Sequence, residues 1–118
     1  MTLDELLKNL HDQPDKIDFN DVMETINNEY NYSPSTFTNG QAENLITNES
    51  GTNEGSCKIF SFAKLNSLTK DQTLACFGKY YREDVLQNPS GKDHANIRTF
   101  MKYGLDDIIF TNSALDKK

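Results

Sequence analysis

The sequence has few of the residues on which disulfide frameworks and metal sites depend. Its 118 residues include two cysteines, Cys57 and Cys76, and two histidines, His11 and His94. Two distant cysteines make no disulfide framework, so we expect both thiols to be reduced. Neither histidine has the close Cys or His neighbour that zinc sites use, and no phosphate loop, dinucleotide glycine fingerprint or Gly-x-Ser-x-Gly elbow is present. We therefore predict no metal and no cofactor.

Positive charge and long apolar runs are also scarce. Twelve basic against eighteen acidic residues give a net charge of −6, which repels the phosphate backbone of nucleic acids. No segment approaches the roughly 20 apolar residues that span a bilayer, and the N-terminus lacks the basic start and apolar run of a signal peptide. We expect a cytoplasmic protein with neither a nucleic-acid nor a membrane partner.

Large apolar side chains are nevertheless frequent enough to close one core. Seven Phe and five Tyr accompany the aliphatic residues. A length of 118 residues also fits one domain, so we expect a single domain over residues 1–118.

Two helices have strong sequence signals at their starts. Thr2 and Glu5 predict a capping box for a first helix, and Thr69 and Gln72 predict another for a long helix that runs through Gln87. Asp18 is a suitable N-cap for a further helix between these two. The three expected inner stripes are Leu3, Leu6, Leu7 and Leu10; Phe19, Val22, Met23, Ile26 and Tyr30; and Leu74, Phe77, Gly78, Tyr81 and Val85.

Two more helices are predicted from apolar content and end signals. Residues 56–65 form an apolar run that suits a buried helix, although its alternation would also suit a strand; we favour the helix. After Gly91, Asp93 is the expected cap of the last helix, which Gly104 would end in the left-handed conformation.

The β structure is predicted from turn residues and one short apolar run. Asn39-Gly40 favours a tight hairpin turn near 35–47, and residues 47–55 are expected to form a mobile loop. Residues 108–110 suit a strand that pairs with this hairpin, and Lys117-Lys118 are expected to be a solvated tail. The fold class is therefore α+β, mainly α, with about five helices and a small two- to three-stranded β element.

The segment from Gly91 to Arg98 has the highest density of chemically capable side chains. His94 and Arg98 are four residues apart and share a helix face near the positive helix end. A thiol of Cys57 or Cys76 brought beside His94 by folding would resemble a nucleophile and its base. These four residues are the weak catalytic candidates.

A structural interpretation of the same residues is more frequent in proteins. Asp93 would cap the helix, His94 would lie on the surface of its first turn, and Arg98 would form a salt bridge. Cys76 would be a small buried residue of the core.

Several long runs of the sequence are similar to one bacterial family. They are GSCKIFSFAKLN at 55–66, QTLACFGKYYR at 72–82 and DHANIRTFM at 93–101, with MTLDELL at 1–7 and FTNG at 37–40. These runs resemble the HopJ family over nearly the whole chain. The resemblance implies the description type III effector, a protein that a type III system secretes into host cells, and it implies no catalytic residue.

Three hypotheses for function follow. The first is a HopJ-type protein that acts by binding a protein partner, consistent with an acidic chain that has no catalytic motif. The second is a small thiol- or histidine-dependent enzyme, which requires Cys57 or Cys76 to share a cavity with His94. The third is an acidic secretion chaperone, which would normally dimerise.

Overall fold

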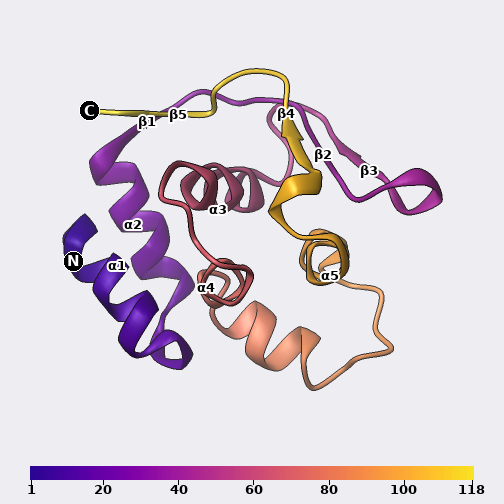
Figure 1. Ribbon diagram of the computed structural model, residues 1–118, viewed down its shortest axis with the longest axis horizontal. Coiled ribbons are helices and arrows are strands. Elements are labelled where there is room, and N and C mark those ends of the chain that lie inside the picture. The colour runs from indigo at the N-terminus through magenta and orange to yellow at the C-terminus, as the bar shows by residue number, and fades with distance from the viewer.

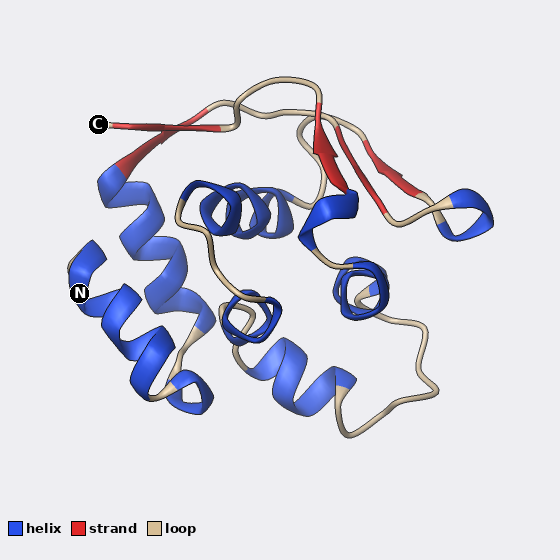
Figure 2. Ribbon diagram, viewed as in Figure 1, coloured by secondary structure: helices blue, strands red, loops and turns tan.

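The predicted amphipathic stretches form five α-helices in the computed structural model, which describes residues 1–118 (Figures 1 and 2). They are α1 (Leu3–Asp12), α2 (Phe19–Glu29), α3 (Glu54–Leu65), α4 (Lys70–Ala75) and α5 (Ala95–Tyr103). Three of them begin with the predicted side-chain caps: Thr2 and Thr69 each complete a capping box, and Asp18 accepts a hydrogen bond from the Asn20 amide. None of the helices combines the length and the apolar character needed to cross a bilayer.

Five short strands form two antiparallel sheets. They are β1 (Tyr30–Tyr32), β2 (Phe37–Asn39), β3 (Ile46–Asn48), β4 (Ile108–Phe110) and β5 (Leu115–Lys117). The three-stranded sheet has the order β3-β2-β4, so the predicted pairing of the 108–110 strand with the hairpin is confirmed. The second sheet pairs β1 with β5. The predicted mainly helical α+β class is thereby confirmed.

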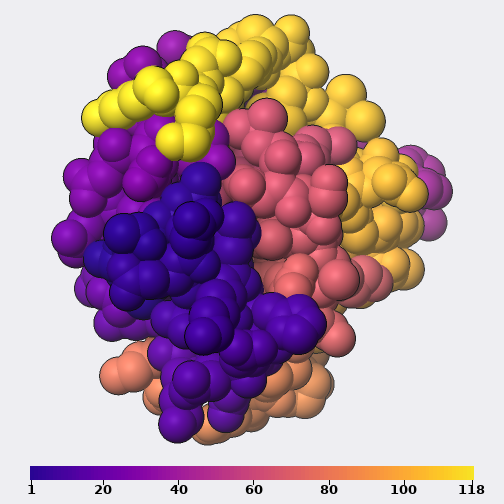
Figure 3. Space-filling view, turned by 60° about the vertical axis from the view of Figure 1, so that its left-hand side comes forward, coloured from indigo at the N-terminus to yellow at the C-terminus, as the bar shows by residue number.

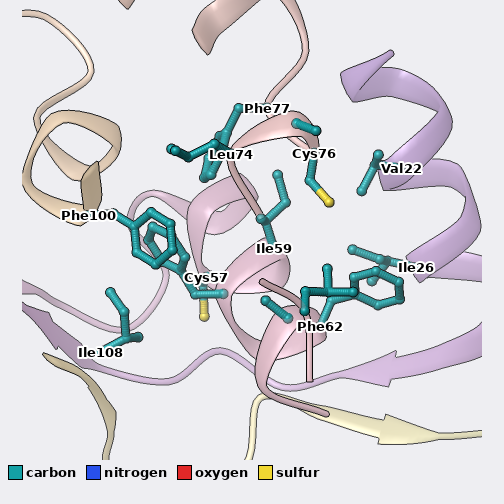
Figure 4. Packing of buried hydrophobic residues seen from close by; sticks show 14 of the residues in the cluster. Val22, Ile26, Cys57, Ile59, Phe62, Leu74, Cys76, Phe77, Phe100 and Ile108 are labelled. Carbon is teal, nitrogen blue, oxygen red and sulfur yellow. The ribbon is translucent and has the colours of Figure 1, made fainter. Parts of the chain in front are cut away.

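Helix α3 lies at the centre of the molecule, with α1 and α2 on one side and α5 on the other (Figure 1). Its Phe60 ring lies 5.9 Å from Phe37 of β2, 5.6 Å from Phe77 and 5.1 Å from Phe100 of α5, measured between ring centroids. Such edge and tilted contacts are favourable beyond the burial of area. The helix prediction for residues 56–65 is therefore correct, and α3 organises a core of 23 buried residues (Figure 4).

The predicted long helix from Thr69 through Gln87 is wrong. Helix α4 ends at Ala75, and a π-helical segment, η3 (Tyr80–Val85), follows a turn at Gly78. Gly78 has a φ of +57°, and a Cβ there would stand 2.8 Å from the Phe19 amide nitrogen of α2. The left-handed conformation and this close approach both require glycine, and together they break the helix.

The predicted irregular hairpin near 35–47 is confirmed in β2 and β3, but three details of turns and ends differ from the prediction. Asn39 pairs with Ile46, so the hairpin loop holds six residues, 40–45, and includes a short 3₁₀ helix instead of a two-residue turn. Residues 47–55 are not one loop, because Asn48 belongs to β3 and α3 begins at Glu54.

The C-terminal end is a strand, and the expected solvated tail is not observed. Lys117 pairs with Tyr30 in the second sheet, and its Nζ lies 2.8 Å from Glu29 Oε2. Figure 3 shows this C-terminal segment lying along the top of the molecule beside the N-terminal half. The pairing explains why such a polar end takes a defined path.

Candidate functional site

A cavity of about 400 Å³ lies where the first turns of α3 and α5 meet the edge of the aromatic core. Its lining residues come from five stretches of the chain, and half of them are hydrophobic. They are Phe19, Ile46, Asn48, Asn53, Gly55, Ser56, Phe77, Tyr80, His94, Ala95, Asn96 and Ile97. A cavity of this size and mixed lining is typical of a small-ligand site.

The two helix N-termini at the cavity have no side-chain caps. The N-cap residues, Asn53 of α3 and His94 of α5, have left-handed backbone with φ of 48° and 52°, and neither side chain bonds a first-turn amide. Five first-turn N–H groups that belong to cavity-lining residues therefore have no acceptor within the protein. They belong to Gly55, Ser56, Ala95, Asn96 and Ile97. Free amides at a helix N-terminus are ready donors for an anion.

Buried asparagines fix these two helix ends relative to each other. Asn48 and Asn96 exchange side-chain hydrogen bonds of 3.1 and 2.8 Å. Asn53 donates to Asn48 at 2.7 Å, and Asn39 donates to the side chain and main chain of Asn96 at 3.1 and 2.9 Å. Asn39, Asn48 and Asn96 are 0, 2 and 7% exposed. This amide network connects β2 and β3 to the starts of both helices.

Three rings form an aromatic wall. The Phe19 and Tyr80 rings meet edge to face at 5.0 Å, and the Tyr80 and His94 rings are 5.4 Å apart. Phe19 fits here because Gly55 has no Cβ, which would stand 3.0 Å from the Phe19 ring. Tyr80 is 43% exposed, so part of its ring is available to a ligand.

The His94 side chain lies in a cluster with two carboxylates. Its Nε2 is 2.9 Å from Asp84 Oδ2 of η3 and 3.8 Å from Asp93 Oδ2. His94 occupies the N-cap position that was predicted for Asp93, so the predicted Asp93 cap is wrong. The local reason is that Asp93 binds Arg98 instead of a helix amide.

Arg98 holds the connection between η3 and α5 in place. Its Nη2 lies 2.7 Å from Asp93 Oδ1, and its Nε and Nη1 donate to the carbonyl oxygens of Asp93 and Asn88 at 2.7 and 2.8 Å. The Arg98 hydrogen bond is the main cause that lowers the pKa of the Asp93 carboxyl. A Cβ at Gly91 would stand 2.6 Å from Arg98 Nη2, so a larger residue there would displace the guanidinium. Arg98 acts as the expected salt-bridge partner.

The two cysteines lie in the core (Figure 4). Neither lines the cavity that contains His94. Cys76 is 0% and Cys57 1% exposed. Burial raises the pKa of the Cys76 thiol to about 12 and also raises the pKa of Cys57. Both thiols are free, as expected. Of the four sequence candidates, the structure therefore brings His94 and Arg98 together and leaves the thiols apart from the cavity.

Sequence reasoning missed the asparagines Asn48, Asn53 and Asn96 and the carboxylate Asp84. Asparagine in a polar stretch usually indicates a loop, and only tertiary pairing shows that Asn48 is buried. Asp84 falls inside the predicted continuous helix, and nothing in the sequence indicates that it contacts His94, ten residues later.

These features define a small, mainly helical α+β protein with a cavity between two helix N-termini. A family model described as HopJ type III effector protein matches residues 3–115, so the chain belongs to the HopJ family. A solved structure described as "Crystal structure of unknown function protein VPA0580" is similar to it, with 47% identity and a TM-score of 0.94. That match covers 100% of this chain and 95% of the other. No curated protein matches the chain.

Proposed function

We propose that this HopJ-family chain acts by binding, and that its cavity receives a compact anionic group, a carboxylate or a phosphate, of the ligand. The observation that carries the proposal is the set of five free first-turn N–H groups at one cavity, supplied by α3 and α5. Each helix N-terminus carries about half a positive charge from the aligned peptide dipoles, so two termini together offset roughly one negative charge.

The net charge of −6 does not oppose this binding at contact distance. Exposed charges are screened beyond about 8 Å at physiological ionic strength, whereas N–H donors act at hydrogen-bond distance. Two carboxylates, those of Asp84 and Asp93, lie beside the cavity-lining His94, and Arg98 pairs with Asp93. Local donors therefore outweigh the overall charge of the chain.

The aromatic wall indicates what the anionic group is attached to. Phe19 and Tyr80 of this wall line the cavity together with Phe77 and offer apolar surface. We infer a ligand that joins an anion to an apolar or aromatic portion. The family description as type III effectors supports a protein partner as the source, with an acidic or phosphorylated side chain or a chain terminus entering the cavity.

The thiol-dependent enzyme has no comparable support. The buried cysteines do not line the His94 cavity, and their pKa values are raised, which keeps the reactive thiolate scarce at neutral pH.

An amide titration tests the proposal directly. Inorganic phosphate and, separately, acetate are added to ¹⁵N-labelled protein, and we expect saturable shifts of the Gly55, Ser56, Ala95 and Asn96 amides. Ser56→Asp places a carboxylate of the protein at the start of α3 and should abolish these shifts. Ser67→Asp makes the same change in charge at an exposed position beyond the other end of α3 and should leave them intact.

A second arm distinguishes a protein source from a free small molecule. Immobilised wild-type and Ser56→Asp chains are compared for capture of phosphorylated and unmodified peptides with aromatic neighbours. Retention by the wild type alone indicates a peptide ligand, and phosphate shifts without peptide retention indicate a free small molecule. Absence of shifts at both helix starts with both anions would refute the proposed function.

A further inference from the structure

We propose that Asp84, Asp93 and His94 form a binding site for a divalent transition-metal ion, with Zn²⁺ as the reference case. One carboxylate oxygen from each aspartate and one nitrogen of His94 lie within 4.8 Å of one another. The site rests on side-chain geometry alone and does not depend on anion binding in the cavity.

The separations of the donor atoms suit one shared ion. Two ligands that each lie about 2.1 Å from Zn²⁺ are about 3.4 Å apart in a tetrahedral arrangement. His94 Nε2 is 2.9 Å from Asp84 Oδ2 and 3.8 Å from Asp93 Oδ2, which brackets that value. The aspartate side chains are about half exposed, so a small rotation of either carboxylate completes the arrangement.

The surrounding contacts orient the donors, and the ion would replace the proton that His94 Nε2 and Asp84 Oδ2 share in their 2.9 Å hydrogen bond. Arg98 binds Asp93 through Oδ1, which leaves Oδ2 directed at His94. Arg98 Nη2 also donates to the main-chain oxygen of Asp84 at 3.3 Å, so one guanidinium connects both carboxylate residues. Support of this kind around the ligands is a regular feature of metal sites. With a neutral imidazole, two carboxylates and one guanidinium leave a net negative charge that favours a cation.

The donor set selects the class of ion. One imidazole nitrogen and two carboxylates suit Zn²⁺ and its first-row neighbours, whereas Ca²⁺ and Mg²⁺ prefer oxygen ligands only. Three protein ligands leave at least one position open, which is the pattern of zinc sites that bind a further ligand. His94 also lines the cavity, so the open position adjoins it.

The simpler alternative is an ordinary His–Asp ion pair, and the chain contains a matched example. His11 Nδ1 lies 2.9 Å from Asp12 Oδ1, the same separation as in the His94–Asp84 pair, but no second carboxylate joins it. If the His94–Asp84 pair had no more affinity for metal than the His11–Asp12 pair, the two histidines would respond to Zn²⁺ in the same way.

The test is a Zn²⁺ titration of the full chain without a polyhistidine tag, followed through the ring ¹⁵N signals of the two histidines. We expect a saturable shift of His94 that precedes any change at His11. Asp84→Asn and Asp93→Asn should each weaken the affinity by roughly tenfold or more, since loss of even a supporting residue typically costs that much. Glu83→Gln removes the same charge from the exposed neighbouring residue and should change little.

The outcomes are decisive because circular dichroism reports the folding of each variant. Preferential His94 binding, lost in either folded aspartate variant and kept in Glu83→Gln, supports the site. Equal response of His11 and His94, no saturable response, or full affinity in both aspartate variants overturns it. The titration contains no phosphate, so its failure would leave the proposed anion binding intact, and the reverse also holds.

Discussion

The amide network predicts that Asn48→Ala is among the most destabilising single changes of a polar residue. The Asn48 side chain donates to Asn96 at 3.1 Å and accepts from Asn96 and Asn53 at 2.8 and 2.7 Å. Its fourth contact, with the Phe37 carbonyl at 3.5 Å, is too long to count for much. Alanine removes these bonds and leaves the buried Nδ2 of Asn96 without a partner.

The magnitude follows from these contacts. An orphaned buried donor costs about 1–3 kcal/mol and each further lost hydrogen bond about 1 kcal/mol, so the sum is about 3–5 kcal/mol. At roughly 0.05–0.15 kcal/mol per residue, a chain of this length has a stability of about 6–18 kcal/mol, so the loss is a large fraction. Asn96→Ala should cost a similar amount, because it leaves the buried Nδ2 of Asn48 with only the long Phe37 contact, while Asn39 keeps its bond to the main-chain oxygen of residue 96.

Urea unfolding measures this prediction. We expect the midpoint of Asn48→Ala to fall while the m-value, which reports the area exposed on unfolding, stays unchanged. Asn28→Ala is the matched control, since Asn28 is exposed on α2, and it should stay within about 0.5 kcal/mol of the wild type. A loss below about 1 kcal/mol for Asn48→Ala would refute the argument that the substitution leaves a buried donor without a partner.

Four further predictions follow from packing and titration. Leu74→Ala should destabilise by about 2–5 kcal/mol in thermal unfolding, because Leu74 is 3% exposed in the core. Cys57 and Cys76 should resist alkylation until denaturant is added, and His94→Ala should not change the rate, because burial protects both thiols. Because the pKa of Asp93 is lowered in the folded protein, its carboxylate contributes fully to stability above the ordinary pKa of 3.8, and this contribution is lost as the pH falls through the lower pKa of the folded state. The difference in unfolding free energy between the wild type and Asp93→Asn should therefore become smaller as the pH falls below 3.8. Replacing residues 48–54 with a Gly-Ser link should destabilise strongly in the same urea assay, whereas replacing only the exposed 49–52 should cost little.

The elements that local rules describe well were predictable from the sequence. The capping boxes at Thr2 and Thr69 and the cap at Asp18 all place helix starts correctly, because the cap and its first turn are adjacent in sequence. The strand at 108–110 was predictable because its apolar run is too short for a helix, and the hairpin, although distant in sequence, was the β element expected to pair with it.

Features that depend on distant contacts were not predictable. Gly78 lay on the expected inner stripe of a continuous helix, and only its contact with the Phe19 amide shows why the chain turns there. The pairing of Asn48 with Asn96 spans 48 residues and shortens the predicted 47–55 loop, which lies between β3 and α3. Of the site, the sequence indicated His94 and Arg98 but not Asp84, because η3 replaces the regular helix in which Asp84 was expected.

The contrast between the helix starts connects the sequence to the site. Helices α1, α2 and α4 begin with Thr2, Asp18 and Thr69, whose side chains bond first-turn amides. The two helices at the cavity begin with Asn53 and His94 in left-handed conformation and lack such bonds. Loss of a side-chain cap costs a helix about 1 kcal/mol. The two helices at the cavity therefore lack a stabilisation that the other three helices have. The free amides of α3 and α5 are therefore available to donate hydrogen bonds to an anionic ligand in the cavity. The phosphate titration of the wild type and of Ser56→Asp tests this proposal.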